Sequence, residues 1–343
     1  MKSSRRKAIL YALLAAVFYA LNMPVSKELL KQIPPTFMAS LLYLGAGFGV
    51  GVIFLLTRKD VRKEDKLAKE DLPYTVGMIL LDILAPILLM MGLTTASAES
   101  ASLLNNFEIV ATSLIALLLF REAISKRLWA GIALITVSSI LLSVEDLSGL
   151  AFSKGSLLVL AATCCWGLEN NCTRQISEKN TYQIVMIKGI FSGLGSFLVA
   201  LLKKESFPGG IAVIYALLLG FVAYGLSIFF YIRAQKDIGA AKTSAYYAVA
   251  PFAGALLAHF IQHEELSKNY GIALLLMIIG SAVVVADTLI VQHCHLHTHT
   301  ITHTHDGSTH THTFTHEHDH VHMLHDDHGH THTPEEIRKA LGH

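Results

Sequence analysis

The sequence predicts an all-helical membrane protein, with ten transmembrane helices arranged as two inverted five-helix repeats and a disordered C-terminal tail. Three observations support this: an apolar composition, ten long apolar stretches and an internal repeat. Of the 343 residues, 52% are hydrophobic and only 15% are charged, whereas a soluble protein carries about 25% charged residues. This composition excludes a soluble enzyme, and the net charge of +1 argues against binding to nucleic acid.

The ten apolar stretches are each close to the length that crosses a bilayer, which is about 20 residues. They lie at roughly 8–25, 35–57, 73–93, 97–119, 127–143, 155–174, 182–202, 211–232, 240–261 and 270–291. Cytoplasmic loops of membrane proteins carry an excess of Lys and Arg. Placing the N-terminus in the cytoplasm puts eighteen of these residues inside and six outside. We therefore expect a multi-pass protein of the inner (plasma) membrane with both termini in the cytoplasm.

The chain also repeats itself. A shift of 142 residues aligns 98–126 with 240–268 and gives eight identities in 29 positions. A shift of 147 residues aligns 19–22 with 166–169. Because five spans is an odd number, the second copy must cross the bilayer in the opposite sense, as in many secondary transporters. The predicted domains are residues 1–145 and 152–292, one per repeat, and a tail at 293–343.

The residues that carry the repeat also resemble a known family. Each half has an aromatic-Gly/Ala-x-polar segment (Tyr19-Ala20-Leu21-Asn22 and Trp166-Gly167-Leu168-Glu169), and a Ser-Lys pair precedes a Gly-x-Ala-Leu helix in both. This pattern resembles the drug/metabolite transporter (DMT) superfamily, and within it the EamA-like ten-helix family. The resemblance implies a proton-coupled or exchange-type carrier with a central cavity and a small-molecule substrate. One departure is that Pro251 of the ninth helix is matched by Ile109 in the fourth, which argues against a hinge shared by both halves.

Polar residues inside the apolar spans are the candidate substrate or proton site. An ionisable side chain at the bilayer centre costs at least about 2.5–3.5 kcal/mol on insertion scales, so such residues usually face a cavity or a partner. We expect Glu169 to pair with Lys188, and we find no obvious cation at the depth of Asp82 or Glu108. The full predicted set is Asp82, Asn105, Glu108, Thr112, Glu169, Asn170, Lys188, Asn22 and Tyr247. The alternative is that these groups only bond one helix to another.

A carboxyl group without a cation in an apolar span favours its protonated form, which is what a proton-coupled carrier requires. This role is assigned first to Glu108, which shares a predicted helix face with Asn105 and Thr112.

The tail contains 17 of the 19 histidines within 51 residues, many of them alternating with Thr. With few apolar residues to bury, it is expected to be disordered. Imidazoles suit Zn, Ni and Co, so the tail is predicted to bind a transition metal through His295, His297, His299, His303, His305, His310, His312, His316, His318, His320 and His322. Two alternatives are a pH sensor and a passive solubilising segment.

The sequence therefore predicts a secondary-active transporter that exports a small organic metabolite and has a metal-binding cytoplasmic tail. A homodimer is compatible with this prediction. No catalytic constellation or required cofactor is predicted, so the protein is not expected to be an enzyme. The alternatives are a transition-metal transporter (Ni, Co or Zn), a metal-regulated membrane protein, and a membrane scaffold that stores metal without transport.

Overall fold

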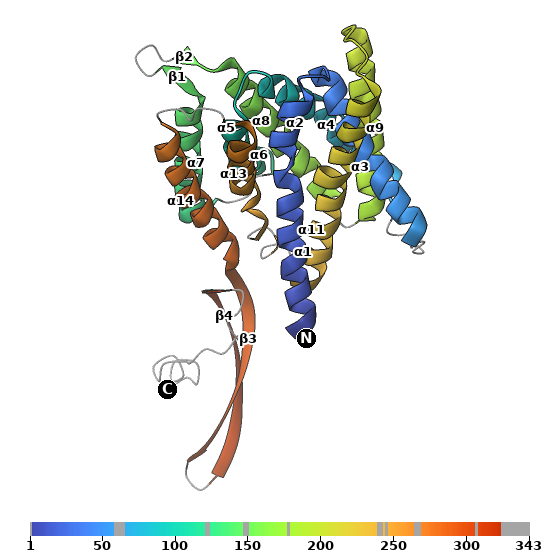
Figure 1. Cartoon of the computed structure of the whole chain (residues 1–343). Helices are drawn as coiled ribbons and strands as arrows, with labels where there is room; N and C mark the ends of the chain where they lie inside the picture. Colours follow the sequence, from blue (N-terminus) through green and yellow to red (C-terminus); the bar gives the residue numbers. More distant parts are fainter. Residues whose placement is uncertain are drawn as a thin grey trace. The chain divides into compact units, whose positions relative to one another are not determined.

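The computed structural model describes residues 2–57, 66–120, 124–146, 151–176, 179–238, 243, 246–263, 269–305 and 308–323. The chain forms two compact units, Met1–Val285 and Ala286–His343. The first unit is helical and contains both halves of the predicted repeat (Figure 1). The second contains the histidine-rich tail.

The first half of the helical unit follows the predicted spans, with interruptions in the first and fourth. Its helices are, in order, α1 (Lys2–Ala20), α2 (Asn22–Leu29), α3 (Pro35–Thr57), the 3-10 turn η2 (Lys69–Asp71), α4 (Leu72–Leu93), α5 (Ala98–Leu104), α6 (Phe107–Phe120) and α7 (Lys126–Ser143). A small antiparallel pair, β1 (Val144–Asp146) and β2 (Ala151–Phe152), leads into the second half.

The second half has the corresponding elements. They are α8 (Lys154–Gln175), α9 (Thr181–Leu202), α10 (Gly210–Leu219), the π-helical segment η3 (Gly220–Leu226), α11 (Ser227–Ile238), α13 (Ala250–Gln262) and α14 (Tyr270–Leu289). The tail forms β3 (Ile290–His305) and β4 (Ser308–Met323). The segments α10, η3 and α11 follow one another without a break, and together they form the eighth predicted span.

Within the described residues, eight helices are long and apolar enough to cross a membrane. Two predicted spans are not among these eight. One is α8, which has 22 residues but carries Glu169, Asn170 and Asn171 in succession. The other is the span predicted at 240–261, where α13 supplies only 13 residues. Both therefore depart from the simple apolar span that the sequence pattern predicts.

The packing of the helices has the symmetry expected of a duplicated chain. The second helices of the two halves, α3 and α9, pack on each other, while α4 packs on α8 in the way that α11 packs on α1. Exchanging the halves converts one of these contacts into the other. Figure 1 shows that α1 and α8 begin at opposite ends of the helical unit, α8 starting next to β1 and β2. The two halves are therefore inverted, as predicted.

Glycines allow the two halves to approach closely at this symmetric contact. A Cβ on Gly47 would lie 2.7 Å from the backbone nitrogen of Ile190, and one on Gly189 would lie 2.5 Å from the Cα of Gly47. Gly45 is equally restricted, because its Cβ would lie 2.1 Å from the carbonyl oxygen of Leu217. Gly45 and Gly47 of α3 are thus helix-packing positions, since only the absence of a side chain lets the backbones meet.

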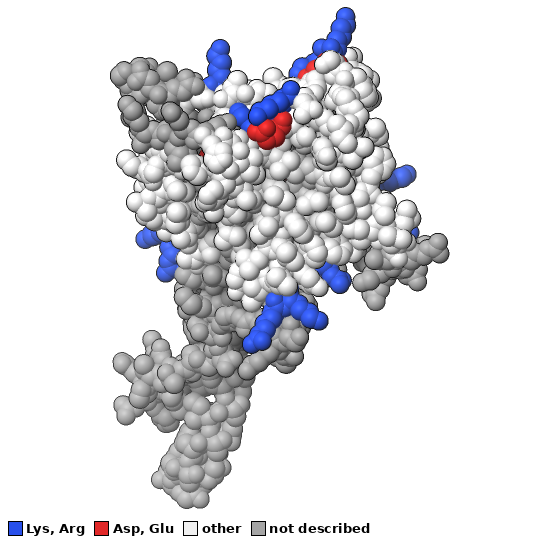
Figure 2. All heavy atoms as spheres, viewed as in Figure 1, with Lys and Arg blue, Asp and Glu red and all other residues white. Residues whose placement is uncertain are grey.

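Charged side chains are sparse over most of the visible surface of the helical unit. Figure 2 shows Lys and Arg mainly toward its upper and lower ends, with largely uncharged surface between them. Many large apolar side chains of the helical unit are exposed, including Leu56, Leu80 and Leu198, which are 80%, 59% and 58% exposed. Such a surface is suited to lipid, and the protein is a multi-pass membrane protein.

The fourth and ninth spans are both broken, contrary to the expectation from Ile109. In the first half, Asn105 and Asn106 form a turn between α5 and α6. In the second half, a turn at 248–249 precedes α13, whose first turn contains Pro251. When the first half is aligned on the second by the shift of 142 residues, these two turns lie within one residue of each other. The first break needs no proline, because the Asn106 side chain donates to the Leu103 carbonyl oxygen at 3.2 Å and so competes with the helical backbone.

The prediction of a disordered tail differs from the structure over 290–323, where β3 and β4 pair as an antiparallel hairpin. The physical reason is the Thr-His alternation itself. Its period of two matches a strand, and Thr is a β-branched residue that favours strands. Residues 324–343, which were also predicted to be disordered, lie outside the described residues, as do the side chains of the predicted metal ligands.

Candidate functional site

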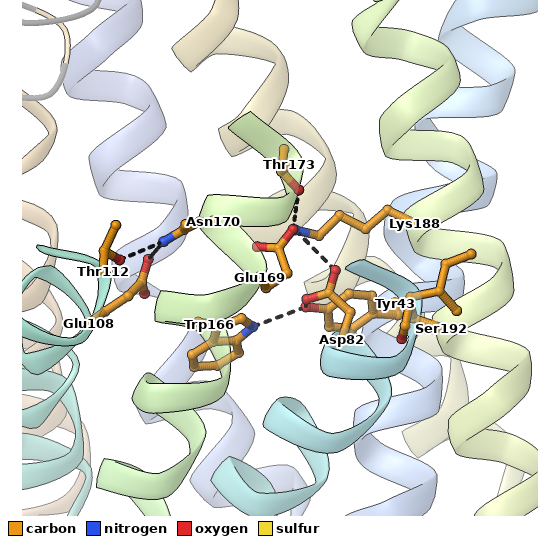
Figure 3. A network of polar contacts seen from close by, with 11 residues as sticks. Tyr43, Asp82, Glu108, Thr112, Trp166, Glu169, Asn170, Thr173, Lys188 and Ser192 are labelled. Carbon is orange, nitrogen blue, oxygen red and sulfur yellow. Dashed lines mark hydrogen bonds and ion pairs between the residues drawn. The ribbon is translucent and has the colours of Figure 1, made fainter. Parts of the chain in front are cut away.

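Three charged side chains meet inside the helical unit (Figure 3). The Nζ atom of Lys188 on α9 lies 3.1 Å from the Oδ2 atom of Asp82 on α4 and 3.0 Å from the Oε1 atom of Glu169 on α8. Both carboxylates are buried, and the lysine side chain is 18% exposed. Asp82 comes from the first half of the chain and the other two from the second, so this ion-pair network joins the halves.

Neutral side chains complete the network around both carboxylates. The Tyr43 hydroxyl of α3 donates to the Oδ1 atom of Asp82 at 2.8 Å, and the indole nitrogen of Trp166 lies 3.4 Å from the same hydroxyl. The Thr173 hydroxyl, one turn after Glu169 on α8, donates to the Oε1 atom of Glu169. These bonds hold the two carboxylates in place around one lysine, since buried charges need both a partner and hydrogen bonds.

Glu108 forms a second link between the halves. It lies in the first turn of α6 and accepts a hydrogen bond of 2.6 Å from the Nδ2 atom of Asn170 on α8. The same amide contacts the Thr112 hydroxyl at 3.3 Å. Among the described residues, no cationic side chain lies within ion-pair distance of Glu108. Glu108 and Asn170 are both half-buried, so this link is less enclosed than the Lys188 network.

Aromatic rings extend from the ion-pair network into both halves. The Tyr43 ring lies 5.4 Å from Tyr224 of η3, which in turn lies 6.0 Å from Tyr19 of α1. Tyr19 also lies 6.0 Å from Tyr247. We refer to Tyr19, Tyr43, Tyr224 and Tyr247 as the tyrosine cluster. It places polarisable rings with hydroxyl groups next to the carboxylate of Asp82, which Tyr43 contacts, and this arrangement suits an organic molecule.

Two amides fix the orientation of the tyrosine cluster. The Nδ2 atom of Asn22 donates to the Tyr224 hydroxyl at 3.0 Å, and Ser26 donates to the Oδ1 atom of Asn22 at 3.1 Å. The Nδ2 atom of Asn105 donates to the Tyr19 hydroxyl at 3.0 Å. The predicted site residues Asn22, Asn105 and Tyr247 therefore meet at the tyrosine cluster, and the remaining ones gather around Lys188 and Glu108.

The structure confirms the predicted contact between Lys188 and Glu169. It corrects the interpretation of Asp82, because the same lysine reaches it from α9. The sequence could not show this, since helix depth alone does not say which faces meet. The predicted stripe of Asn105, Glu108 and Thr112 is also divided by the turn at 105–106, so that Asn105 bonds to Tyr19 while the other two meet Asn170. Roles for these residues in binding stay predictions.

Sequence analysis did not single out Tyr43 or Trp166 as site residues. Tyr43 lies in a glycine-rich apolar helix, where nothing in the pattern distinguishes it from a packing residue. Trp166 is visible only as the repeat counterpart of Tyr19. Among the side chains that the structure describes, no group of three or more His, Cys, Asp or Glu residues is placed to hold a metal ion.

An inverted pair of helical bundles with a shared polar network at their junction is the architecture of a membrane transporter. Comparison with known proteins gives the family. The model of the EamA-like transporter family matches twice, at residues 6–144 and 153–286. The chain belongs to the EamA-like transporter family, and the two matches correspond to its two halves.

Individual relatives agree with this assignment. An "Uncharacterized transporter" of Methanothermobacter thermautotrophicus is 26% identical over 293 residues, covering 78% of this chain and 82% of the relative. The "Uncharacterized transporter YyaM" of Bacillus subtilis is 23% identical over 216 residues, covering 60% and 70%. A solved structure titled "Crystal structure of protein" shares the fold with a TM-score of 0.61, at 18% identity, over 82% of this chain and 96% of that one.

Proposed function

We propose that the protein is a secondary-active carrier that exports a small organic metabolite in exchange for protons. The observation that carries this proposal is the position of Lys188 between two carboxylates, one from each half. Alternating access requires the halves to change their relative orientation about a central site. A cation held by both halves is a contact that such a movement must break or remake.

Proton coupling follows from the chemistry of this contact. A proton added to Asp82 neutralises one of the two carboxylates that hold Lys188, and so removes one ion pair between the halves. A proton added to Glu108 leaves its bond with Asn170 as a neutral hydrogen bond, which is weaker than one to a carboxylate. Protonation therefore loosens the junction at two places.

The site also favours a class of substrate. Lys188 is the one described cation of the network and pairs with Asp82 and Glu169. Glu108 adds a third carboxylate, which contacts the same helix α8 through Asn170, so the region has an excess of negative charge. The tyrosine cluster adds aromatic faces beside it. An amine-bearing metabolite with an apolar body would satisfy both features, because aromatic faces and carboxylates attract ammonium groups. In this scheme the chain acts as a carrier and not as an enzyme.

The test is transport by purified protein in liposomes, across a panel of amines, amino acids and neutral metabolites, with and without a pH gradient. We expect amines to be transported and the pH gradient to accelerate their movement. Glu108→Gln should transport without responding to the gradient, whereas Glu28→Gln, at an exposed pair with Lys31, should behave as the parent protein. Proton-driven transport that persists in Glu108→Gln would remove Glu108 from the mechanism.

The second candidate is a transition-metal transporter or a metal-regulated membrane protein in which a cytoplasmic tail supplies or senses the ion. The spacing of the histidines on β3 and β4 favours it. Liposome transport of Zn²⁺, Ni²⁺ or Co²⁺ that is lost on deleting residues 293–343 would support this candidate. Amine transport unaffected by that deletion would support the first.

A further inference from the structure

The register of the β3–β4 hairpin places its histidines on one face and its threonines on the other. Residues that pair directly across an antiparallel ladder lie on the same face of the hairpin, and each strand alternates between its two faces. With His295 opposite His318, every histidine of the two described strands falls at a register position of one face. The other face carries four Thr-Thr pairs: Thr298 with Thr315, Thr300 with Thr313, Thr302 with Thr311, and Thr304 with Thr309.

Within the histidine face, the two strands also match each other position by position. Four pairs of histidines are direct register partners: His293 with His320, His295 with His318, His297 with His316, and His303 with His310. Three of these pairs are consecutive along the face. A disordered chain with the same composition would bring together only histidines that are near in sequence, so the hairpin creates a different set of neighbours.

We propose that the β3–β4 hairpin binds divalent transition metal ions through pairs of histidines that are register partners on its two strands. Direct partners in an antiparallel ladder have Cα atoms about 4.5–5.5 Å apart. Two imidazoles at that separation can supply two of the four ligands of a tetrahedral zinc ion. The proposal is independent of what the helical unit transports.

Ligand chemistry restricts the metal. Imidazole nitrogens suit Zn, Ni, Co and Cu, whereas hard ions such as Mg and Ca prefer oxygen ligands. Cys294 pairs with Asp319 and Leu296 with Glu317 on the opposite face, so the thiol and these carboxylates are not part of the histidine ladder. The four histidine pairs thus offer imidazole ligands alone. Zn²⁺ is the probe of choice because it has no geometric preference of its own beyond four-coordination.

Metal binding and strand pairing should stabilise each other. An isolated two-stranded hairpin is at best marginally stable in water. Each ion held by one histidine from β3 and one from β4 cross-links the strands, and the paired strands hold the ligands at the required separation. The Thr-Thr pairs of the other face support the same register, since cross-strand Thr pairs are favourable.

The test compares two double variants of the full-length protein that remove the same number of histidines. His295→Ser with His318→Ser removes both members of one pair. His295→Ser with His310→Ser removes one member from each of two pairs. After equilibrium dialysis against Zn²⁺ in detergent, bound zinc is measured by mass spectrometry relative to the parent protein.

We expect the first variant to keep about three quarters of the zinc capacity and the second about half, because they break one and two of the four pairs. Chelation by near neighbours within one strand predicts the reverse order, because His318 has neighbours at 316 and 320, whereas His310 has only His312 two residues away. Equal capacities, the reverse order, or no zinc bound by the parent protein would each overturn the proposal. Unchanged thermal unfolding of the helical unit is the control.

Discussion

The two halves of the helical unit share a plan of helices but differ in the residues at equivalent positions. In the first half, α1 ends at Ala20 and α2 resumes at Asn22, whereas α8 continues without interruption through the equivalent residues. Tyr19 and Asn22 stand where α8 has Trp166 and Glu169. Asn105 of the fourth span corresponds to Tyr247 of the ninth. The polar site is therefore asymmetric, although the helices of the two halves pack symmetrically.

This difference separates two requirements of a carrier. The repeated backbone provides two similar bundles that can rock against each other. The diverged side chains provide one cation, Lys188 on α9, and carboxylates on both sides of it. A fully symmetric site would have duplicated the lysine as well. The duplication thus accounts for the fold, and the divergence accounts for the chemistry.

The largest expected effect comes from removing the shared cation. Lys188→Met leaves Asp82 and Glu169 facing each other without their partner, and should lower the free energy of unfolding by about 3–5 kcal/mol and abolish transport. Adding Asp82→Asn and Glu169→Gln should restore stability but not transport. Thermal unfolding in detergent and liposome transport give the two readings. Full transport by either variant would contradict a role for the network in coupling.

A second prediction concerns the close contact between α3 and α9. Gly47→Ala forces a Cβ against the backbone of Ile190, so we expect a loss of about 1–3 kcal/mol by overpacking. Gly51→Ala is the matched control on the same helix, because its nearest neighbour is the terminal carbon of Met186 at 3.6 Å. Similar unfolding temperatures for the two variants would show that the junction can widen without cost.

A third prediction compares the two broken helices. Asn106→Leu removes the side-chain bond to the Leu103 carbonyl oxygen, and Pro251→Ala removes the proline after the turn at 248–249. Both changes favour a continuous helix, and we expect each to slow transport several-fold with little loss of stability. An effect confined to Pro251→Ala would mean that only the second half bends during transport.

The smallest expected effect is at the loop that follows α9. Burial opposes ionisation of Glu205, but hydrogen bonds from Thr36, Lys203 and the Phe37 backbone N–H outweigh it and hold the pKa of Glu205 below its ordinary value. Because the folded-state pKa is depressed, the stabilisation is present at neutral pH and is lost as the pH falls through the acidic range of this carboxyl group.

Glu205→Gln should therefore cost on the order of 1 kcal/mol at neutral pH, and the difference from the parent protein should vanish in acid. Unfolding temperatures measured across a pH series, with Glu28→Gln as the surface control, check this expectation. A difference that is constant with pH would mean that the carboxylate charge does not matter at this position.

Much of the fold could be predicted from local pattern. The lengths of the apolar stretches predicted most of the spans. The repeat predicted the inversion, because an odd number of spans reverses the second copy. The pattern was less informative where side chains act on the backbone. Asn105 and Asn106 look like part of a polar helix face, yet they end α5. The low hydrophobicity of the tail predicted disorder. The alternation of Thr and His, which has a period of two, instead matches the strands of the hairpin.

The site was predictable in its members but not in its contacts. Polar residues are conspicuous in apolar spans, so Asp82, Glu169 and Lys188 could be recognised by composition alone. Which of them meet depends on how the helices rotate and pack, and this is why the lysine shared by both carboxylates was found only in the structure. Tyr43 is the clearest omission, since its hydroxyl reaches Asp82 from a helix with no polar pattern.

The sequence by itself determined that the chain enters a bilayer, that it is built twice and that its histidines are concentrated in one segment, because these properties depend only on the order and type of residues. The tertiary structure decided which carboxylates share Lys188, where the fourth and ninth spans break, and which histidines become register partners. Those outcomes depend on helix rotation and strand register, and both are set by contacts between residues far apart in the chain.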